Sequence, residues 1–256
     1  MLITAIGLRG YRLDCLDGDI GKVKEFYFDD HYWTIRYLVA DTGNWLANRQ
    51  VLLSPHATGP VSNAEQRIAI HLTRKQIADS PSVDSDKPVS RQSEVDYYAY
   101  YGWPMYWNGP FIWGPFPYIP RTREAQDAPT PPEHVWDPHL RSTRDVIGHH
   151  VQGEDGAIGH VQDFIIDDET WAIRYLIVAT RNWWPGKKVL IAPPWIGRIS
   201  WDELKVFVTL SRENIKQSPE YTEASLLTRA YETDLHRHYS RRGYWDNEPV
   251  VKPKSR

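Results

Sequence analysis

The chain contains one unit twice, and this repeat constrains its fold more than any other feature of the sequence. Asp17-Gly18-Asp19-Ile20-Gly21 returns as Asp155-Gly156-Ala157-Ile158-Gly159, an offset of 155 − 17 = 138 residues. At the same offset Trp-Thr-Ile-Arg-Tyr-Leu (33–38) returns as Trp-Ala-Ile-Arg-Tyr-Leu (171–176), and the match runs without a gap to Ser80-Pro81 and Ser218-Pro219. A self-match this long indicates two copies of one small domain.

The repeat divides the chain into four parts: copy one at 1–82, a linker or strap rich in proline and aromatic residues at 83–142, copy two at 143–220, and a C-terminal helix with a basic tail at 221–256. Each copy has roughly 75–80 residues, which is near the lower limit for a single self-sufficient core. A second surface, from the other copy or from a second chain, would stabilise each unit. We therefore expect self-association, most simply a homodimer.

The pattern within each copy predicts a mainly β fold. Runs such as 20–28 and 33–40 are rich in Val, Ile, Phe, Tyr and Trp and are bounded by Asp-Gly and Asp-Asp turns. Short strands at 51–53 and 68–72 follow, and Thr73 to Gln76 has the form of a capping box that starts a short helix. Closely spaced strands with one terminal helical turn are typical of a small β-barrel. The fold class expected is two small barrels in tandem, with short helices and a C-terminal helix.

The central hairpin predicts an ion pair in each copy. If residues 29–32 form a four-residue loop, Phe28 faces Trp33, and Glu25 then faces Arg36. The same register in copy two places Asp163 opposite Arg174. Because apolar residues share this face, each arginine should be at least half-buried and should need a carboxylate partner. The expected structural ion pairs are Glu25–Arg36 and Asp163–Arg174.

The pattern D-G-x-I-G-x-V-x-x-F-x-x-D-D-x-x-W-x-I-R-Y-L, followed by V-L and Pro, resembles the PRC-barrel domain. Copy one carries it at Asp17, Gly18, Ile20, Gly21, Val23, Phe26, Asp29, Asp30, Trp33, Ile35, Arg36, Tyr37, Leu38, Val51, Leu52 and Pro55. Copy two repeats it at Asp155, Gly156, Ile158, Gly159, Val161, Phe164, Asp167, Asp168, Trp171, Ile173, Arg174, Tyr175, Leu176, Val189, Leu190 and Pro193. The arrangement is similar to the tandem two-barrel bacterial branch of that family.

The resemblance implies a small β-barrel that docks proteins or RNA and has no catalytic residues. The family includes the cytoplasmic domain of the photosynthetic reaction-centre H subunit and the C-terminal domain of a ribosome-maturation factor. The H subunit has a transmembrane anchor, and the maturation factor has a different N-terminal domain; neither is expected here. Fold analogy therefore favours docking without naming the partner.

The segment 97–118 is unusual because half of its residues are aromatic, and its Pro and Gly disfavour long helices or central strands. Left in water, it would expose a large apolar patch. It is either an ordered strap over the barrels or a recognition surface, since Tyr and Trp are favoured hot-spot residues. The candidate interaction residues are Tyr101, Trp103, Tyr106, Trp107, Trp113 and Trp184.

Comparison of the two copies argues against an enzyme. Cys15, the single cysteine, is matched by Gly153, and the histidines do not recur at matched positions. The adjacent acids Asp29-Asp30 and Asp167-Asp168 fit loop caps better than a metal site. We expect no catalytic residues, no metal and no cofactor.

The end of the chain predicts a helix starting at Ser218-Pro219, with an apolar stripe at Ala224, Leu227, Tyr231 and Leu235. The formal net charge of −3 argues against broad binding to nucleic acid or membrane. No run of 18 apolar residues occurs, so no membrane insertion is expected, and the protein should be cytoplasmic.

The function that fits best is a non-catalytic scaffold or adaptor that docks another protein. One alternative is a small-molecule site in a Trp- and Tyr-rich cleft between the barrels. Another is RNA or ribosome-assembly binding, or an assembly role like that of the reaction-centre H subunit; for RNA, a contiguous basic face should exist.

Overall fold

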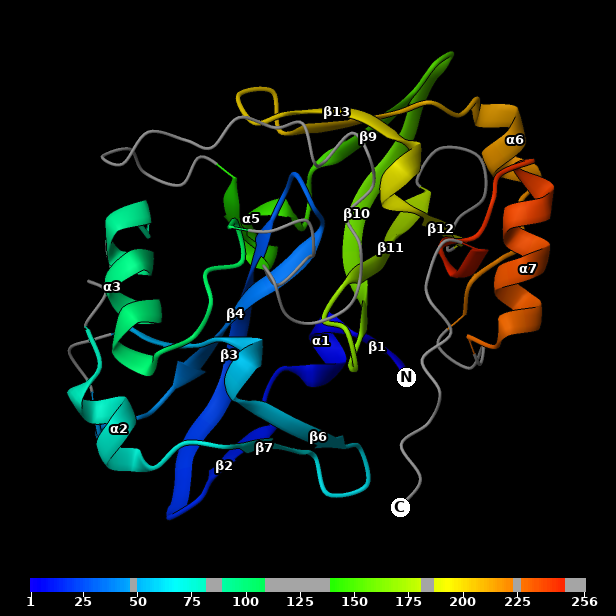
Figure 1. Cartoon of the computed structure of the whole chain (residues 1–256). Coiled ribbons are helices and arrows are strands. Elements are labelled where there is room, and N and C mark those ends of the chain that lie inside the picture. Colours follow the sequence, from blue (N-terminus) through cyan, green and yellow to red (C-terminus); the bar gives the residue numbers. More distant parts are fainter. Residues whose placement is uncertain (47–49, 82–88, 109–138, 181–186, 223–226, 247–256) are drawn as a thin grey trace.

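The computed structural model describes residues 1–46, 50–81, 89–108, 139–180, 187–222 and 227–246 (Figure 1). The described residues form two seven-stranded sheets, with helices around them. The prediction of a mainly β fold with short helices and a C-terminal helix is confirmed. The boundaries proposed for the four parts of the chain stay a prediction.

The first sheet is built mostly from copy one and has the order β5-β4-β3-β2-β7-β6, with β8 paired to β3. Its strands are β2 (Arg12–Cys15), β3 (Gly18–Asp29), β4 (Thr34–Asp41), β5 (Val51–Leu53), β6 (Thr58–Ser62), β7 (Arg67–Ile70) and β8 (Leu140–Ser142). The long β3 and β4 form the central hairpin, in agreement with the Asp-Gly and Asp-Asp turn signals.

The second sheet has the equivalent order, β12-β11-β10-β9-β14-β13, with β1 paired to β10. Its strands are β1 (Leu2–Thr4), β9 (His150–Gly153), β10 (Gly156–Asp167), β11 (Ile173–Thr180), β12 (Lys188–Ile191), β13 (Ile196–Ser200) and β14 (Lys205–Val208). The two repeats therefore share one topology.

The repeats exchange their first strands. β1 belongs to the start of the first repeat but pairs with β10 of the second, and β8 belongs to the start of the second repeat but pairs with β3 of the first. Each sheet is complete only with a strand from the other repeat.

Helices lie at the ends of the strands and at the two sides of the molecule. They are α1 (Ala5–Leu8), α2 (Arg74–Asp79), α3 (Arg91–Tyr101), α5 (Thr143–Val146), α6 (Arg212–Gln217) and α7 (Arg229–His238), with 3-10 turns η1 (Pro55–Ala57), η2 (Pro193–Trp195) and η3 (Tyr244–Asp246). The capping box predicted at Thr73 and Gln76 is present at the start of α2. α3 and α7 lie on opposite sides of the molecule (Figure 1).

The predicted start of the C-terminal helix is wrong. Ser218 caps the C-terminal end of α6, and its carbonyl accepts a hydrogen bond from Lys187 Nζ at 2.9 Å. The helix α7 instead begins after Thr228, whose side chain accepts from the backbone N–H of Tyr231. Thr228 satisfies an N–H group that would otherwise have no partner in the first turn, so it sets the start of the helix. Ala224 lies outside the described residues.

Close backbone approach requires a glycine at the same point of both central hairpins. A Cβ on Gly21 would lie 2.0 Å from the carbonyl oxygen of Asp41, and a Cβ on Gly159 would lie 1.9 Å from that of Ala179. No side chain fits at such distances, which explains why the Asp-Gly-x-Ile-Gly pattern keeps its second glycine in both repeats.

The predicted register of the central hairpins is also wrong. Phe28 pairs with Ile35 rather than with Trp33, and Glu25 pairs with Val39 rather than with Arg36. The loop lies at 30–33, one residue later than expected, so that Asp29 pairs with Thr34. The β-bulge between Tyr27 and Phe28 then shifts the pairing by one more residue. In copy two, Asp163 pairs with Ile177 for the same reason.

Aromatic side chains fill the contact between the repeats. The rings of Phe28 and Phe164 lie 5.6 Å apart, and Phe26 lies 6.2 Å from Trp171. Trp171 also donates its indole N–H to Thr58 Oγ1 of the first repeat at 3.1 Å. This packing occupies the region where a small-molecule cleft between barrels was the alternative, so that alternative gains no support from these residues.

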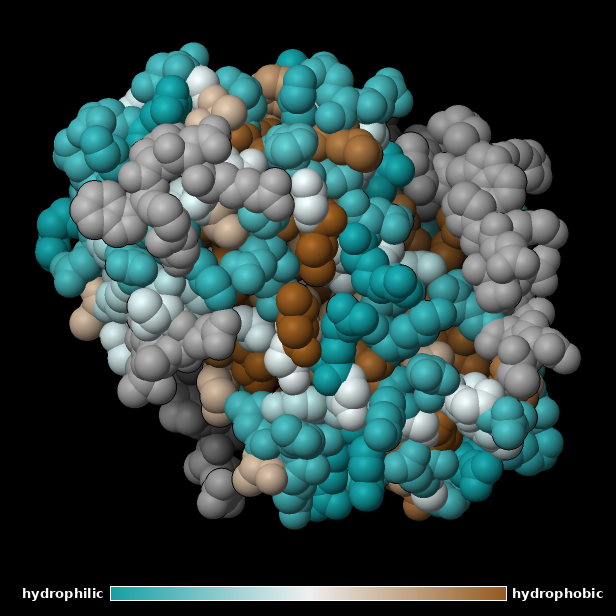
Figure 2. All heavy atoms as spheres, turned by 180° about the vertical axis from the view of Figure 1, so that it is seen from behind, coloured by the Kyte–Doolittle hydropathy of each residue, from teal (hydrophilic) through white to brown (hydrophobic). Residues whose placement is uncertain are grey.

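From behind, hydrophilic residues cover most of the visible surface, and hydrophobic ones appear between them (Figure 2). Within the described part of the chain, no helix combines the length and the apolar character required to cross a membrane.

Candidate functional site

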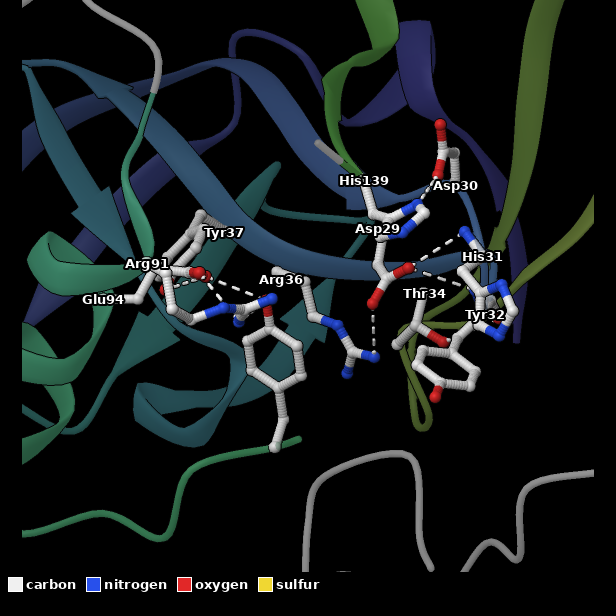
Figure 3. Close-up of polar contacts among 11 residues, drawn as sticks. Asp29, Asp30, His31, Tyr32, Thr34, Arg36, Tyr37, Arg91, Glu94 and His139 are labelled. Carbon is white, nitrogen blue, oxygen red and sulfur yellow. Dashed lines mark hydrogen bonds and ion pairs between the residues drawn. The ribbon is translucent and has the colours of Figure 1, made fainter. Parts of the chain in front are cut away.

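The most distinctive polar feature of the first repeat is a buried cluster around Arg36 (Figure 3). Arg36 lies in β4 with its side chain fully buried, and its Nη2 lies 3.2 Å from Asp29 Oδ2 at the end of β3. Its guanidinium carbon lies 3.9 Å from the ring centre of Tyr106, a cation–π contact. An arginine this deep requires a carboxylate, and the structure supplies Asp29.

Glu94 forms the centre of an adjoining network and joins helix α3 to the sheet (Figure 3). Its Oε1 accepts hydrogen bonds from the hydroxyls of Tyr37 and Tyr106, each at 2.9 Å. Arg91, one turn earlier in α3, places Nη1 2.9 Å from Glu94 Oε2. Arg91 also lies over Trp107, with its guanidinium carbon 4.2 Å from the ring centre.

The second repeat carries the same network at the same offset. Glu232 Oε1 accepts from the hydroxyls of Tyr175 and Tyr244 at 2.9 Å each, and Arg229 Nη1 lies 3.1 Å from Glu232 Oε2. Arg174 Nη2 lies 2.8 Å from Asp167 Oδ2, and the Arg174 guanidinium carbon lies 3.9 Å from the Tyr244 ring centre. The two networks thus agree in partners and geometry.

Burial and a neighbouring carboxylate raise the pKa values of tyrosines in both networks. Burial, and then the charge of Glu94, raise the pKa of Tyr37 well above its ordinary value; burial and Glu232 do the same to Tyr175. Burial raises the pKa of Asp167, but Arg174 and the hydrogen bonds from Glu169 and Thr170 together hold that pKa below its usual value. At neutral pH the hydroxyls keep their protons and donate them to a carboxylate.

The two adjacent acids at the end of each hairpin strand have different partners. The first acid of each pair caps its own loop: Asp29 Oδ1 accepts from the N–H groups of His31 and Tyr32, and Asp167 Oδ1 accepts from that of Glu169. The interpretation of these acids as loop caps is confirmed for both first positions. The second acid binds the other repeat. In the first repeat, Asp30 Oδ1 lies 2.9 Å from His139 Nδ1.

The predicted ion pairs need correction. Because the register differs, Arg36 and Arg174 pair with Asp29 and Asp167, four residues after Glu25 and Asp163 in each repeat. Glu25 instead accepts a hydrogen bond from the hydroxyl of Ser142 at the end of the exchanged strand β8. Asp163 accepts from the backbone N–H of Ile6 at 3.2 Å, and burial raises the pKa of this carboxyl to about 6.

The candidate interaction residues fall into three groups. Tyr106 is only 1% exposed and belongs to the buried network, so it cannot present a surface. Tyr101, Trp103 and Trp107 are partly buried and pack against the core. Trp113 and Trp184 lie outside the described residues.

Tyr100, Tyr101 and Trp103 form an aromatic face at the end of α3. Tyr101 and Trp103 stack with ring centres 4.4 Å apart and an interplanar angle of 12°, and Tyr100 is 42% exposed. The rings of His56 and Trp103 also stack, with centres 5.6 Å apart, and burial followed by the charge of Arg36 lowers the pKa of His56 to about 4. The His56 ring is therefore neutral at neutral pH.

Sequence reasoning missed the network of α3 and α7, although the signal was present. At the offset of 138, Arg91, Glu94, Tyr101, Tyr106 and Trp107 return as Arg229, Glu232, Tyr239, Tyr244 and Trp245. The repeated pattern of residues therefore continues to Trp107 and Trp245. The substituted positions between these matches hide the continuation from a search for identical runs.

Two observations on the described residues concern metal and thiol chemistry. No group of three or more His, Cys, Asp and Glu side chains among them is arranged to hold a metal ion. Burial, and then Asp17 and Asp19, raise the pKa of Cys15 to about 12, so its thiol stays protonated at neutral pH.

In each sheet six strands follow the same order and a seventh comes from the other repeat, so the chain is a mainly β protein with a duplicated fold. Residues 139–209 match the family model of the PRC-barrel domain, and this part of the chain belongs to the PRC-barrel family. A search of the curated proteins finds no match to the chain.

Proposed function

We propose that this chain is a non-catalytic adaptor that binds another protein through the aromatic face of α3, made by Tyr100, Tyr101 and Trp103. One observation carries the proposal: the charged and tyrosine positions common to both repeats form internal contacts, whereas the outer ends of α3 and α7 differ. PRC-barrel domains generally act as protein-interaction modules, which supports the same function. We expect it to act in the cytoplasm without chemistry of its own.

We further propose that the first repeat is a second PRC-barrel domain. Its sheet has the strand order of the matched repeat, and its Arg36, Asp29 and Glu94 occupy the positions of Arg174, Asp167 and Glu232. Two domains with one scaffold can then present different surfaces.

The two helix ends present different chemistry. At the positions of Tyr100 and Trp103, the second repeat has His238 and Arg241, and Arg241 is exposed. Tyr and Trp are enriched where interfaces gain most of their energy. The first repeat therefore suits an apolar or aromatic patch on a partner, and the second repeat gives a matched comparison on the same scaffold.

The adaptor proposal predicts that Tyr100→Ser with Trp103→Ser abolishes retention of a specific partner. Loss of hot-spot aromatic side chains costs about 2 kcal/mol or more, which weakens binding roughly 30-fold. The measurement is affinity purification of the tagged full chain from its native host, with quantitative mass spectrometry. Ribonuclease treatment of the extract separates direct protein partners from those held by RNA.

Arg241→Ser in the second repeat is the control, because it changes the equivalent position and leaves the aromatic face intact. It should retain the partner, and the thermal melting of both variants shows whether they fold. Equal retention by all three proteins would reject the aromatic face as the docking surface.

A further inference from the structure

Each repeat begins with an arm that leaves its own sheet. The arms are residues 1–9, which contain β1 and α1, and residues 139–147, which contain β8 and α5. The chain returns to its own sheet immediately after each arm, where the N–H of Gly10 donates to Val23 O and that of Gly148 to Val161 O, both at 2.8 Å. Gly10 and Gly148 have φ of 83° and 96°, a conformation that glycine adopts readily.

Backbone pairing fixes each arm at the end of the other sheet. Leu2, Ile3 and Thr4 pair with Asp167, Ile166 and Ile165, and Leu140, Arg141 and Ser142 pair with Asp29, Phe28 and Tyr27. The N–H of Asp168 donates to Met1 O at 3.0 Å, and the N–H of Asp30 donates to His139 O at 2.8 Å. Each arm therefore adds an extended strand to the other sheet, the geometry of β-addition.

Two acids at each site contact the arm through side chains. Asp168 binds the amino group of Met1, and Asp30 binds the ring of His139, at the first residue of either arm. Asp163 accepts from the N–H of Ile6 in α1, and Glu25 accepts from the hydroxyl of Ser142, the last residue of β8. The same two acidic positions therefore bind the arm of the other repeat in both sheets.

Apolar burial adds to the polar contacts. Leu8 in one arm and Val146 at the same position of the other are both fully buried. Ile6, by contrast, is 48% exposed although it lies two residues from Leu8. One side of each arm faces the fold and the other faces solvent.

A third contact between the repeats is reciprocal as well. The N–H of Ile35 donates to Trp171 O, and the N–H of Ile173 donates to Trp33 O, both at 2.8 Å. Trp33 and Trp171 have φ of 53° and 57°, which is rare for a bulky residue and aims both carbonyls across the contact. Residue i contacts j and j contacts i, as in a twofold dimer.

We propose that the arm-receiving end of each sheet is a self-recognition site, whose ligand is the arm of a second copy of the repeat. Within one chain the linker supplies that copy at high effective concentration, so the two sites are filled internally. The second surface that each small unit needs then comes from the other repeat, and the chain is a monomer. The site does not depend on the linker, and it accepts an arm from another chain when one is offered.

The test uses the full chain with a protease site inserted between residues 109 and 138, cut after folding. The two fragments should stay together as one species with the mass of the uncut chain, measured by light scattering after size exclusion. Mixing cut chains with and without an affinity tag, at low denaturant, should give tagged–untagged pairs. Fragments that separate while both keep their native circular dichroism would overturn the proposal.

Two substitutions in the same arm show whether the arm carries the recognition. Leu8→Gln should raise the dissociation constant of the cut pair at least 10-fold, and Ile6→Gln should leave it within about 2-fold. An equal effect of both would reject the arm as the ligand. If Leu8→Gln does not fold, Asp30→Asn with Asp168→Asn provides the second variant: a several-fold rise supports the proposal, and an unchanged constant contradicts it.

Discussion

At the scale of single residues, Arg36 and Arg174 show how a buried charge restricts its surroundings. A buried guanidinium needs a carboxylate nearby, so a partner for each arginine follows from the sequence. Which of the available acids takes that role depends on the register. The position of the hairpin loop and the bulge beside it give the role to Asp29 instead of Glu25, and to Asp167 instead of Asp163. The acids left over, Glu25 and Asp163, bind the exchanged arms.

Asp163→Asn should change how stability depends on pH. Burial raises the pKa of Asp163 from 3.8 to about 6, so between these values the folded chain holds a proton that the unfolded chain has released. The free energy of unfolding contributed by this group therefore falls as the pH rises through that window, by up to about 3 kcal/mol at 1.36 kcal/mol per pKa unit. The free energy of unfolding of the variant minus that of the native chain should therefore be larger at pH 7 than at pH 4.

Urea denaturation of the variant and the native chain at both pH values measures this difference. The other titrating groups contribute equally to both proteins and do not affect it. Asp167→Asn is the opposite case, because Arg174 lowers the pKa of Asp167 and the carboxylate stabilises the fold above its ordinary pKa. That variant should lose stability at pH 7. A difference between Asp163→Asn and the native chain that does not vary with pH would contradict the prediction.

At the scale of elements, α3 and α7 are held to their sheets by polar contacts at the same positions. In each helix an arginine pairs with a buried glutamate three residues later, and the glutamate receives two tyrosine hydroxyls. One of those tyrosines comes from the sheet, and the other from the Tyr-Trp pair beyond the helix. The glutamate thus joins helix, strand and following segment.

Glu232→Ala should destabilise the second repeat by about 3 kcal/mol. The substitution removes the buried acceptor of the Tyr175 and Tyr244 hydroxyls, and a buried polar group that loses its partner is costly. It also removes the ion-pair partner of Arg229, which is exposed. Urea denaturation followed by tryptophan fluorescence measures the loss, because Trp245 follows Tyr244 and lies over Arg229.

Asp234→Ala is the control on the same helix, since Asp234 is exposed and pairs only with Arg237 among the contacts described for it. Its effect should stay within about 0.5 kcal/mol. Similar losses in both variants would show that the helix is weakened in general, and that the buried acceptor is not responsible.

At the scale of the whole molecule, strand exchange couples the two repeats. Neither sheet is complete without the other repeat, so one repeat cannot unfold without removing a strand from its neighbour. Cooperative units in proteins follow such shared contacts. The chain should therefore behave as one thermodynamic unit despite its duplicated sequence.

This coupling predicts a single unfolding transition. Urea denaturation followed by far-ultraviolet circular dichroism and by tryptophan fluorescence should give coincident curves. Leu8→Gln weakens one arm and should destabilise the contact between the repeats first. In that variant the circular dichroism and fluorescence curves should therefore no longer coincide. Two separate transitions in the native chain would mean that the repeats fold independently.

The sequence by itself determined the duplication, the mainly β class, the turn glycines, the capping box at Thr73 and the need for a carboxylate near Arg36 and Arg174. These follow from periodicity, local backbone geometry and charge, which act over a few residues. Only the tertiary structure decided the partner acids, the exchange of arms and the burial of Tyr106 beside Glu94. The position of the hairpin loop, the packing of α3 on its sheet and contacts between residues more than a hundred positions apart set these features, and no local pattern contains that information.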